Sequence, residues 1–380
     1  MPFRESSPVE ERIALFRAYD SGAFSAAELC RRYGISRDVF YAWKRRRDSG
    51  EARWFEERSR APGRCPHAVP PSMVAAIVAM RQRFARFGPK KIKARLALDA
   101  PDVAWPAAST IGDILKREGL VTALPRRRKP VEQGTIVAGS DVPNGEWAID
   151  FKGWFRTADG RRCDPLTVSD TASRYLIAAH ITPPTHAGVK AALETVFGEI
   201  GLPEAIRSDN GPPFGSTGAG GLSRLSVWFL RLGIAPRFIP PASPQDNGRH
   251  ERMHRTLKAE TACLPAYDRK QQQARFDIFR AAYNEQRPHE ALGQTPPASH
   301  WWPPIRRLPA RIEEPWYDPD HEVRRVRTDG TIKWRGERVF IGEALIGEVI
   351  GLLEQERGGH LVCFCGRDLG LIDAAVRFHR

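Results

Sequence analysis

The hydrophobic pattern of this 380-residue chain changes its period near residue 140. Before that point, apolar residues recur every three to four positions, as in amphipathic helices. After it, short strand-like runs alternate with helical segments. The chain is also longer than a single hydrophobic core supports, which is ~250–300 residues. The sequence therefore predicts a multidomain protein with all-α units first and a mixed α/β domain after them.

Residues 1–58 form the first predicted unit, a helix-turn-helix domain. The pattern over residues 9–50 predicts three helices, with Ser25-Ala-Ala-Glu28 as a capping box at the start of the second. Gly34-Ile35-Ser36 makes the turn into a strongly basic third helix, which favours DNA binding over the alternative of a protein-docking module. The candidate phosphate contacts here are Arg37, Lys44, Arg45 and Arg46.

Residues 70–122 form a second predicted helix-turn-helix-like DNA-binding domain. Helices are expected over residues 73–87, 89–96 and 109–118. Pro89 suits a first helical turn, Ser109 or Thr110 suits an N-cap, and Gly119 suits a C-cap. Lys90 and Lys91 are its candidate DNA contacts.

Residues 123–140 read as a basic linker. Proline and like charges disfavour compact structure there and favour contact with a DNA backbone. The residues expected to make that contact are Arg126, Arg127 and Arg128.

The distribution of charge supports a nucleic acid partner. The formal net charge is +14, and residues 1–140 carry 27 Lys and Arg against 15 Asp and Glu, a net of +12. Such an excess favours a polyanion, here double-stranded DNA, over a merely solvated surface or a membrane. The six cysteines lack a paired framework, and no signal peptide or long apolar run is evident, which predicts a reducing cytoplasm, no structural zinc and no membrane association.

Residues 141–300 are predicted to hold a mixed sheet covered by helices. Strands are expected over residues 147–151, 165–170, 174–181, 205–208 and 237–239, with helices over 186–200 and 222–232. A small β-rich domain is expected over residues 316–380, where short β-like segments alternate with glycines.

Three carboxylates fall where this sheet would bring them together. Asp150 lies on a central strand, Asp209 follows a second strand, and Glu251 opens a helix. Each alone is weak evidence, because an Asp at a strand end is more often a turn or cap residue. Together they offer the hard oxygen ligands that Mg²⁺ prefers. Asp164 and Asp170 compete for these roles, but Asp170 lies in a predicted hairpin turn and is interpreted as structural.

The motifs around these acids resemble those of the DDE transposase and retroviral integrase superfamily, specifically bacterial insertion-sequence transposases with an integrase-type core. The segments that carry the resemblance are Trp147-Ala-Ile-Asp-Phe151, Arg207-Ser-Asp-Asn-Gly211, Ser243-Pro-Gln-Asp-Asn-Gly-Arg-His-Glu-Arg252 and Tyr283-Asn-Glu-Gln-Arg-Pro-His289. The resemblance implies an RNase H-like core over residues 141–300. It also implies that Asp150, Asp209 and Glu251 are catalytic residues and hold Mg²⁺, with Mn²⁺ as a substitute and two ions per site. Gln245, Arg255 and Lys258 are the expected DNA contacts near the site.

The activity implied by this resemblance is DNA transposition. Such an enzyme binds the ends of an insertion sequence, cleaves at the 3′ ends by metal-dependent hydrolysis and joins them to target DNA by transesterification. A homo-oligomer on DNA, associated with the bacterial nucleoid, is expected. The alternatives are an RNase H-like nuclease and a domesticated DNA-binding regulator.

Two local features distinguish this sequence from the expected core: the spacing between Asp209 and Glu251, and the two histidines beside Glu251. The step from Asp209 to Glu251 is 42 residues, longer than is usual in retroviral integrases, and the excess falls in the glycine-rich segment 215–221, which predicts a loop. His250 and His254 flank Glu251, but imidazole is a poorer Mg²⁺ ligand than carboxylate. DNA contact or packing is the expected role of both histidines.

Overall fold

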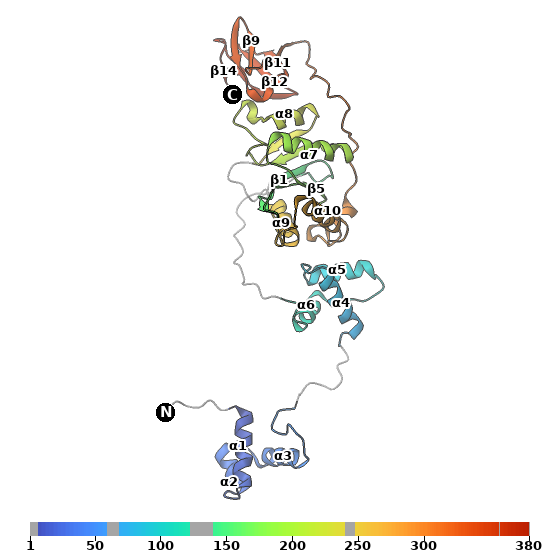
Figure 1. The fold of residues 1–380 in the computed structure, drawn as a ribbon, viewed down its shortest axis with the longest axis vertical. Helices are drawn as coiled ribbons and strands as arrows, with labels where there is room; N and C mark the ends of the chain where they lie inside the picture. Colours follow the sequence, from blue (N-terminus) through green and yellow to red (C-terminus); the bar gives the residue numbers. More distant parts are fainter. Residues whose placement is uncertain (1–6, 59–67, 122–139, 240–247, 357, 380) are drawn as a thin grey trace, which may run out of the picture. The chain divides into compact units, whose positions relative to one another are not determined.

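The computed structural model describes residues 7–58, 68–121, 140–239, 248–356 and 358–379 (Figure 1). The chain divides into two compact units, residues 1–69 and 70–380.

The first unit contains three short helices around an aromatic core. They are α1 (Pro8–Asp20), α2 (Ala26–Tyr33) and α3 (Arg37–Asp48). Phe16 and Phe40 stack with ring centroids 5.2 Å apart, and Leu29 is fully buried beside them. These bounds confirm the predicted helix-turn-helix layout. The Ser25 side chain accepts a hydrogen bond from the Glu28 amide, as expected, whereas a reciprocal capping box forms at α1 between Ser7 and Glu10.

The second unit begins with three further helices, α4 (Pro71–Arg83), α5 (Pro89–Asp99) and α6 (Ala108–Arg117). Pro89 opens α5, and Gly119 follows α6 with φ 70°, where the Leu120 amide donates to the Leu115 carbonyl at 2.8 Å. The predicted N-cap at Ser109 or Thr110 is wrong. The helix starts earlier, with Ala107 as a cap that makes no side-chain bond, so both hydroxyl residues fall inside the first turn.

A five-stranded mixed sheet follows, in the order β5-β4-β1-β6-β7. Its strands are β1 (Trp147–Phe151), β4 (Pro165–Asp170), β5 (Leu176–Ile181), β6 (Ala205–Ser208) and β7 (Ala235–Phe238). The first three pair antiparallel, whereas β1, β6 and β7 run parallel. The predicted mixed sheet is therefore present.

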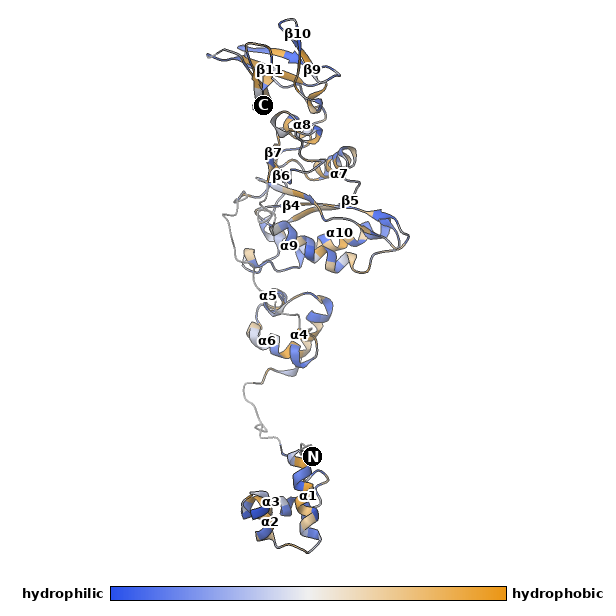
Figure 2. Cartoon of the chain, turned by 90° about the vertical axis from the view of Figure 1, so that its left-hand side faces the viewer, coloured by the Kyte–Doolittle hydropathy of each residue, from blue (hydrophilic) through white to orange (hydrophobic). Residues whose placement is uncertain are grey.

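Helices cover both faces of this sheet, as Figures 1 and 2 show. The helices are α7 (His186–Glu199) and α8 (Arg224–Arg231) on one face and α9 (Gly248–Leu257) and α10 (Arg269–Glu285) on the other. Trp147 and Ile149 of β1 are buried against the α7 and α8 side. Because side chains alternate along a strand, Ala148 and Asp150 face α9 and α10.

Two local features of this sheet were not predicted. A short hairpin forms between β2 (Phe155–Arg156) and β3 (Arg162–Cys163). The strand expected over residues 174–181 begins only at Leu176, because Arg174 takes left-handed backbone with φ 63° in the turn after Asp170.

The C-terminal region is an antiparallel β domain, as predicted. Its five-stranded sheet has the order β14-β13-β12-β11-β8, and β9 and β10 form a separate pair. The strands are β8 (His321–Arg325), β9 (Thr331–Trp334), β10 (Glu337–Phe340), β11 (Val349–Glu354), β12 (His360–Phe364), β13 (Arg367–Ile372) and β14 (Phe378–His379).

The glycine-rich segment between Asp209 and Glu251 is more than a loop. Ala219 and Leu222, with Val227 of α8, belong to the same buried apolar cluster as Ile332 and the rest of the C-terminal domain's core. Gly220 takes left-handed backbone with φ 60°, and a Cβ atom there would lie only 3.1 Å from the Leu369 side chain, so both the backbone and the close approach favour glycine. The C-terminal domain therefore packs against this segment.

Candidate active site

Asp150 and Asp209 lie at the same level on neighbouring strands. In the parallel pairing of β1 with β6, Trp147 is opposite Ile206 and Ala148 is opposite Arg207. Each aspartate lies three residues beyond Trp147 or Ile206, at the carboxyl ends of strands that run about 4.8 Å apart. Partial burial raises the pKa of Asp209, whose Oδ1 accepts a hydrogen bond from the Gly211 amide at 3.3 Å.

A buried hydroxyl fastens α9 to the sheet beside these aspartates. Thr167 of β4 is fully buried, and its Oγ1 lies 2.7 Å from His250 Nε2 and 2.6 Å from His254 Nε2. The same hydroxyl lies 3.1 Å from the Asp150 carbonyl oxygen, and Ser169 Oγ lies 2.9 Å from His250 Nδ1.

Both histidines are neutral at physiological pH. Burial lowers the pKa of His250 to about 3 and that of His254 to about 2. His254 Nδ1 lies 3.9 Å from an Asp150 carboxylate oxygen. The sequence left DNA contact and packing open as roles for these two histidines. The structure supports packing, because the imidazoles hold α9 against β4.

Glu251 lies between these two histidines on α9, with its residue exposed to solvent. The carboxylate oxygens of Asp150, Asp209 and Glu251 do not all lie within 4.8 Å of one another. Among the described residues, three potential metal-ligating side chains do lie within that distance of one another. They are Asp318, Asp320 and His321, on the surface of the C-terminal region. The structure thus aligns two members of the predicted triad and places the third on the adjoining helix.

The competing acids are engaged elsewhere. Asp164 forms an ion pair with Arg162 at 2.7 Å. Asp170 is 1% exposed, and its two oxygens accept from the Asn144 amide at 2.8 Å and the Ser173 amide at 2.7 Å. This geometry agrees with the interpretation of Asp170 as a structural turn residue.

The predicted DNA contacts in the first unit divide into two groups. Arg37 and Arg45 are exposed on α3. Lys44 instead pairs with Asp48 at 2.7 Å, and Arg46 pairs with Glu51 at 2.7 Å. The last two cations are therefore partly neutralised within the protein.

The remaining candidates lie on helices or outside the described residues. Lys90 is exposed and Lys91 half-buried on the first turn of α5. Arg255 is exposed on α9, and the exposed Lys258 opens a π-helical turn, Lys258–Ala262, that follows it. Arg126, Arg127, Arg128 and Gln245 lie outside the described residues.

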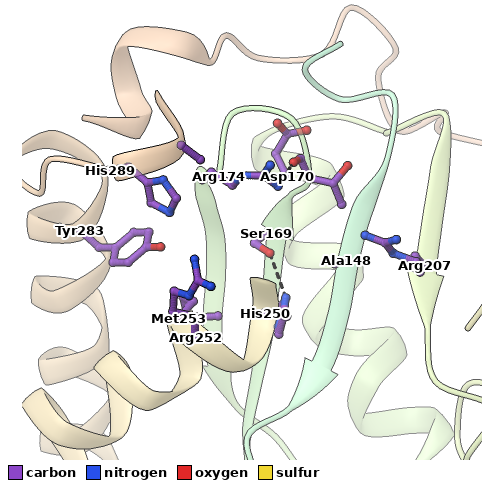
Figure 3. Close-up of a pocket in the computed structure, with 12 residues that line it drawn as sticks. Ala148, Ser169, Asp170, Arg174, Arg207, His250, Arg252, Met253, Tyr283 and His289 are labelled. Carbon is purple, nitrogen blue, oxygen red and sulfur yellow. Dashed lines mark hydrogen bonds between the residues drawn. The ribbon is translucent and has the colours of Figure 1, made fainter. Parts of the chain in front are cut away.

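The structure also shows a basic pocket that sequence reasoning missed. It is lined by residues of the β4–β5 turn, α9 and α10, including Arg174, Arg252, Tyr283 and His289 (Figure 3). Arg252, Tyr283 and His289 lie in two of the motifs quoted above, which were interpreted only as markers of the core.

Comparisons with known proteins agree with this architecture. A helix-turn-helix domain matches residues 11–53, and integrase core domains match residues 141–244 and 232–297. The C-terminal domain of IS481 family transposases matches residues 321–378. Over 296 residues the chain is 27% identical to an uncharacterized 39.2 kDa protein of insertion element IS476 from Xanthomonas euvesicatoria, covering 77% of each chain. These matches support an insertion-sequence transposase that carries an integrase core.

The chain is also similar to a protein of another insertion element and to a solved integrase core. It is 27% identical to a 31.7 kDa protein of insertion element IS407 from Burkholderia multivorans, over 60% of this chain and 79% of that one. The catalytic core of HTLV-2 integrase, solved in complex with magnesium, is 17% identical with a TM-score of 0.33, over 42% of this chain and 97% of that one. Integrase-core proteins generally use a divalent metal. In the described residues, no helix is long and apolar enough to span a membrane.

Proposed function

We propose that this transposase binds the ends of its insertion sequence, cuts them at the 3′ ends and joins them to target DNA. The observation that carries the proposal is the alignment of Asp150 and Asp209 at the ends of adjacent parallel strands, with Glu251 on the helix fastened beside them.

The chemistry would proceed in two displacements at phosphorus. Water first attacks the phosphodiester at the element end, and the bond to the 3′ oxygen breaks to leave a 3′-hydroxyl and a 5′-phosphate. That hydroxyl then attacks a target phosphodiester, so one P–O bond forms, another breaks, and a target 3′-hydroxyl leaves. No covalent bond to the protein is needed.

The donor set fits a divalent metal. Asp150, Asp209 and Glu251 offer hard carboxylate oxygens, which suit Mg²⁺, with Mn²⁺ as a substitute and two ions per site. Bound there, such ions would stabilise the attacking and leaving oxygens of an in-line displacement. The protein's own part is to orient: Thr167 and the two neutral histidines hold α9 against β1, and exposed Lys258 would bind a nearby DNA phosphate.

The other domains would supply DNA recognition. The helix-turn-helix match and the charge excess of residues 1–140 support binding of double-stranded DNA by the predicted domains at 1–58 and 70–122. Pairing two element ends calls for at least two copies of the chain on DNA. The alternatives, an RNase H-like nuclease and a DNA-binding regulator, would lack the joining step or both steps.

The test replaces each carboxylate by its amide. Asp150→Asn, Asp209→Asn and Glu251→Gln keep the side-chain size but lose the charge that holds a metal, so each should abolish cleavage and joining while DNA binding persists. The assay is Mg²⁺- or Mn²⁺-dependent processing and joining of a labelled duplex bearing the element end, with gel-shift binding in parallel.

The matched control is Glu199→Gln, an exposed carboxylate on α7, which should keep full activity. Asp170→Asn, which a simple turn would tolerate, is unsuitable, because an Asn amide would face one of the buried backbone N–H groups that Asp170 now accepts. Robust joining by any of the three triad variants would refute the assignment. Cleavage without joining by the unaltered protein would favour the nuclease.

A further inference from the structure

A cavity of about 160 Å³ lies between the sheet, α9 and α10, on the same face of the sheet as Asp150. Its walls come from β1, β4, the turn after β4, β6, α9, α10 and the segment that follows α10. By volume it holds several waters, and thus a small polar group. The carboxylate chemistry described above does not use it.

The lining of this cavity is strongly cationic. Of the described residues that line it, three are arginines, Arg174, Arg207 and Arg252, and one is an acid, Asp170. The acid accepts hydrogen bonds from its own turn, and Arg207 pairs with the buried Glu146 at 3.3 Å. The Arg174 guanidinium donates to the Thr171 carbonyl, and Arg252 adds a further positive charge to the lining.

A tyrosine hydroxyl without a hydrogen-bond partner among the described residues points into the same space. Tyr283 is 6% exposed, lines the cavity, and its hydroxyl makes no hydrogen bond to any described residue. Burial raises the pKa of Tyr283, so the hydroxyl keeps its proton and can donate. Figure 3 shows this hydroxyl, the Arg252 guanidinium and the His289 ring directed toward one another across the opening.

Two further observations mark the place as built for a ligand. Nδ1 of His289 is buried and also lacks a hydrogen-bond partner among the described residues. Arg174 holds left-handed backbone with φ 63°, a conformation that is costly for a residue with a side chain. Strain of this kind persists where the surrounding structure fixes it, and here it aims a cation at the cavity.

We propose that this pocket binds a phosphate group, with Arg174 and Arg252 as cationic partners and the Tyr283 hydroxyl as a neutral donor. Guanidinium groups match phosphate oxygens in geometry and charge. The phosphate is a DNA strand phosphate held beside the α9 active site, which rests on the proposed function. A free phosphate ion offers the same chemistry.

The experiment measures binding of the full-length protein to a labelled duplex by fluorescence anisotropy over a range of salt, in EDTA so that no strand is cut. Arg252→Gln and Arg174→Gly should each lower the slope of log affinity against log salt by about one, the effect of losing one phosphate contact. Tyr283→Phe should weaken binding about tenfold with an unchanged slope, because it removes an uncharged donor.

Arg275→Gln is the matched control on α10, because this exposed arginine does not line the pocket, and it should bind as the unaltered protein does. In Arg174→Gly, glycine adopts φ 63° without strain, but the side-chain hydrogen bond to the Thr171 carbonyl is lost. Its melting curve is therefore measured in parallel, so that a loss of affinity is compared at equal folded fraction.

A second arm distinguishes the sources of phosphate. Sodium phosphate, compared with sodium chloride at equal ionic strength, should raise the melting temperature of the unaltered protein more than that of Arg252→Gln. This rise together with unchanged DNA slopes would assign the pocket to free phosphate. Unchanged slopes and no phosphate effect would overturn the site. Since binding is measured without catalysis, neither result depends on the fate of the carboxylate triad.

Discussion

Replacing Thr167 with valine removes a single hydroxyl at the point where α9 meets the sheet. That hydroxyl is the partner of two buried imidazole nitrogens, at 2.6 and 2.7 Å. A buried polar group that loses its partner costs about 1–3 kcal/mol, so two such groups predict a loss of roughly 2–6 kcal/mol. Thr167→Ser keeps the hydroxyl and should cost only about 1 kcal/mol for the lost methyl group.

Hydrogen exchange measures this loss locally, which suits a chain of several domains. The opening free energy of backbone amides in β1 and β4, read from peptides covering residues 147–151 and 165–170, should fall by the stated amount in Thr167→Val. Thr195→Val is the control, because this exposed threonine donates only to the carbonyl one turn earlier in α7. An effect below about 0.5 kcal/mol in Thr167→Val would refute the view that the hydroxyl holds α9 to the sheet.

Two other predictions concern the same face of the core. Burial lowers the pKa of His289 to about 4, against an ordinary value of 6.5. The unfolded chain therefore binds a proton at a higher pH than the folded chain does. As a result, the free energy of unfolding decreases as the pH falls from 6.5 toward 4. Between pH 7 and 5.5 the loss should be about 1 kcal/mol, and a urea midpoint in His289→Gln that shifts with pH as much as in the unaltered protein would contradict it. Lys258→Ala should slow strand joining while leaving the melting curve unchanged, since Lys258 is exposed; an unaltered joining rate would assign it to plain solvated surface.

The sequence predicted those parts of the fold that local patterns determine. Helices with a clear apolar period and strands that form short apolar runs were placed within a few residues of their observed ends. The predicted strand that began at Arg174 failed, because the Asp170 carboxylate organises a tight turn through contacts that no periodicity reveals. The predicted N-cap of α6 was wrong because Ala107 takes that position, and a cap that makes no side-chain hydrogen bond leaves no signal in the sequence.

The candidate site shows the same limit. Its three acids could be proposed from the sequence because each lies in a recognisable motif, and their role stays a prediction. The role of the flanking histidines could not, because it depends on Thr167, which is more than 80 residues away in the chain and unremarkable in sequence. The basic pocket was missed for the same reason: Arg174, Arg252 and Tyr283 meet only through the packing of a turn against two helices.

The packing of the C-terminal domain against the glycine-rich segment affects how such proteins can diversify. Because Ala219 and Leu222 share a buried core with Ile332, the C-terminal domain and the glycine-rich segment must change together. More than 100 residues separate them in the chain. A chimera that exchanges the C-terminal domain between relatives while keeping the native 215–222 segment would pair mismatched surfaces. The extra length between Asp209 and Glu251 is therefore expected to be inherited with the last domain rather than with the neighbouring strands of the core sheet.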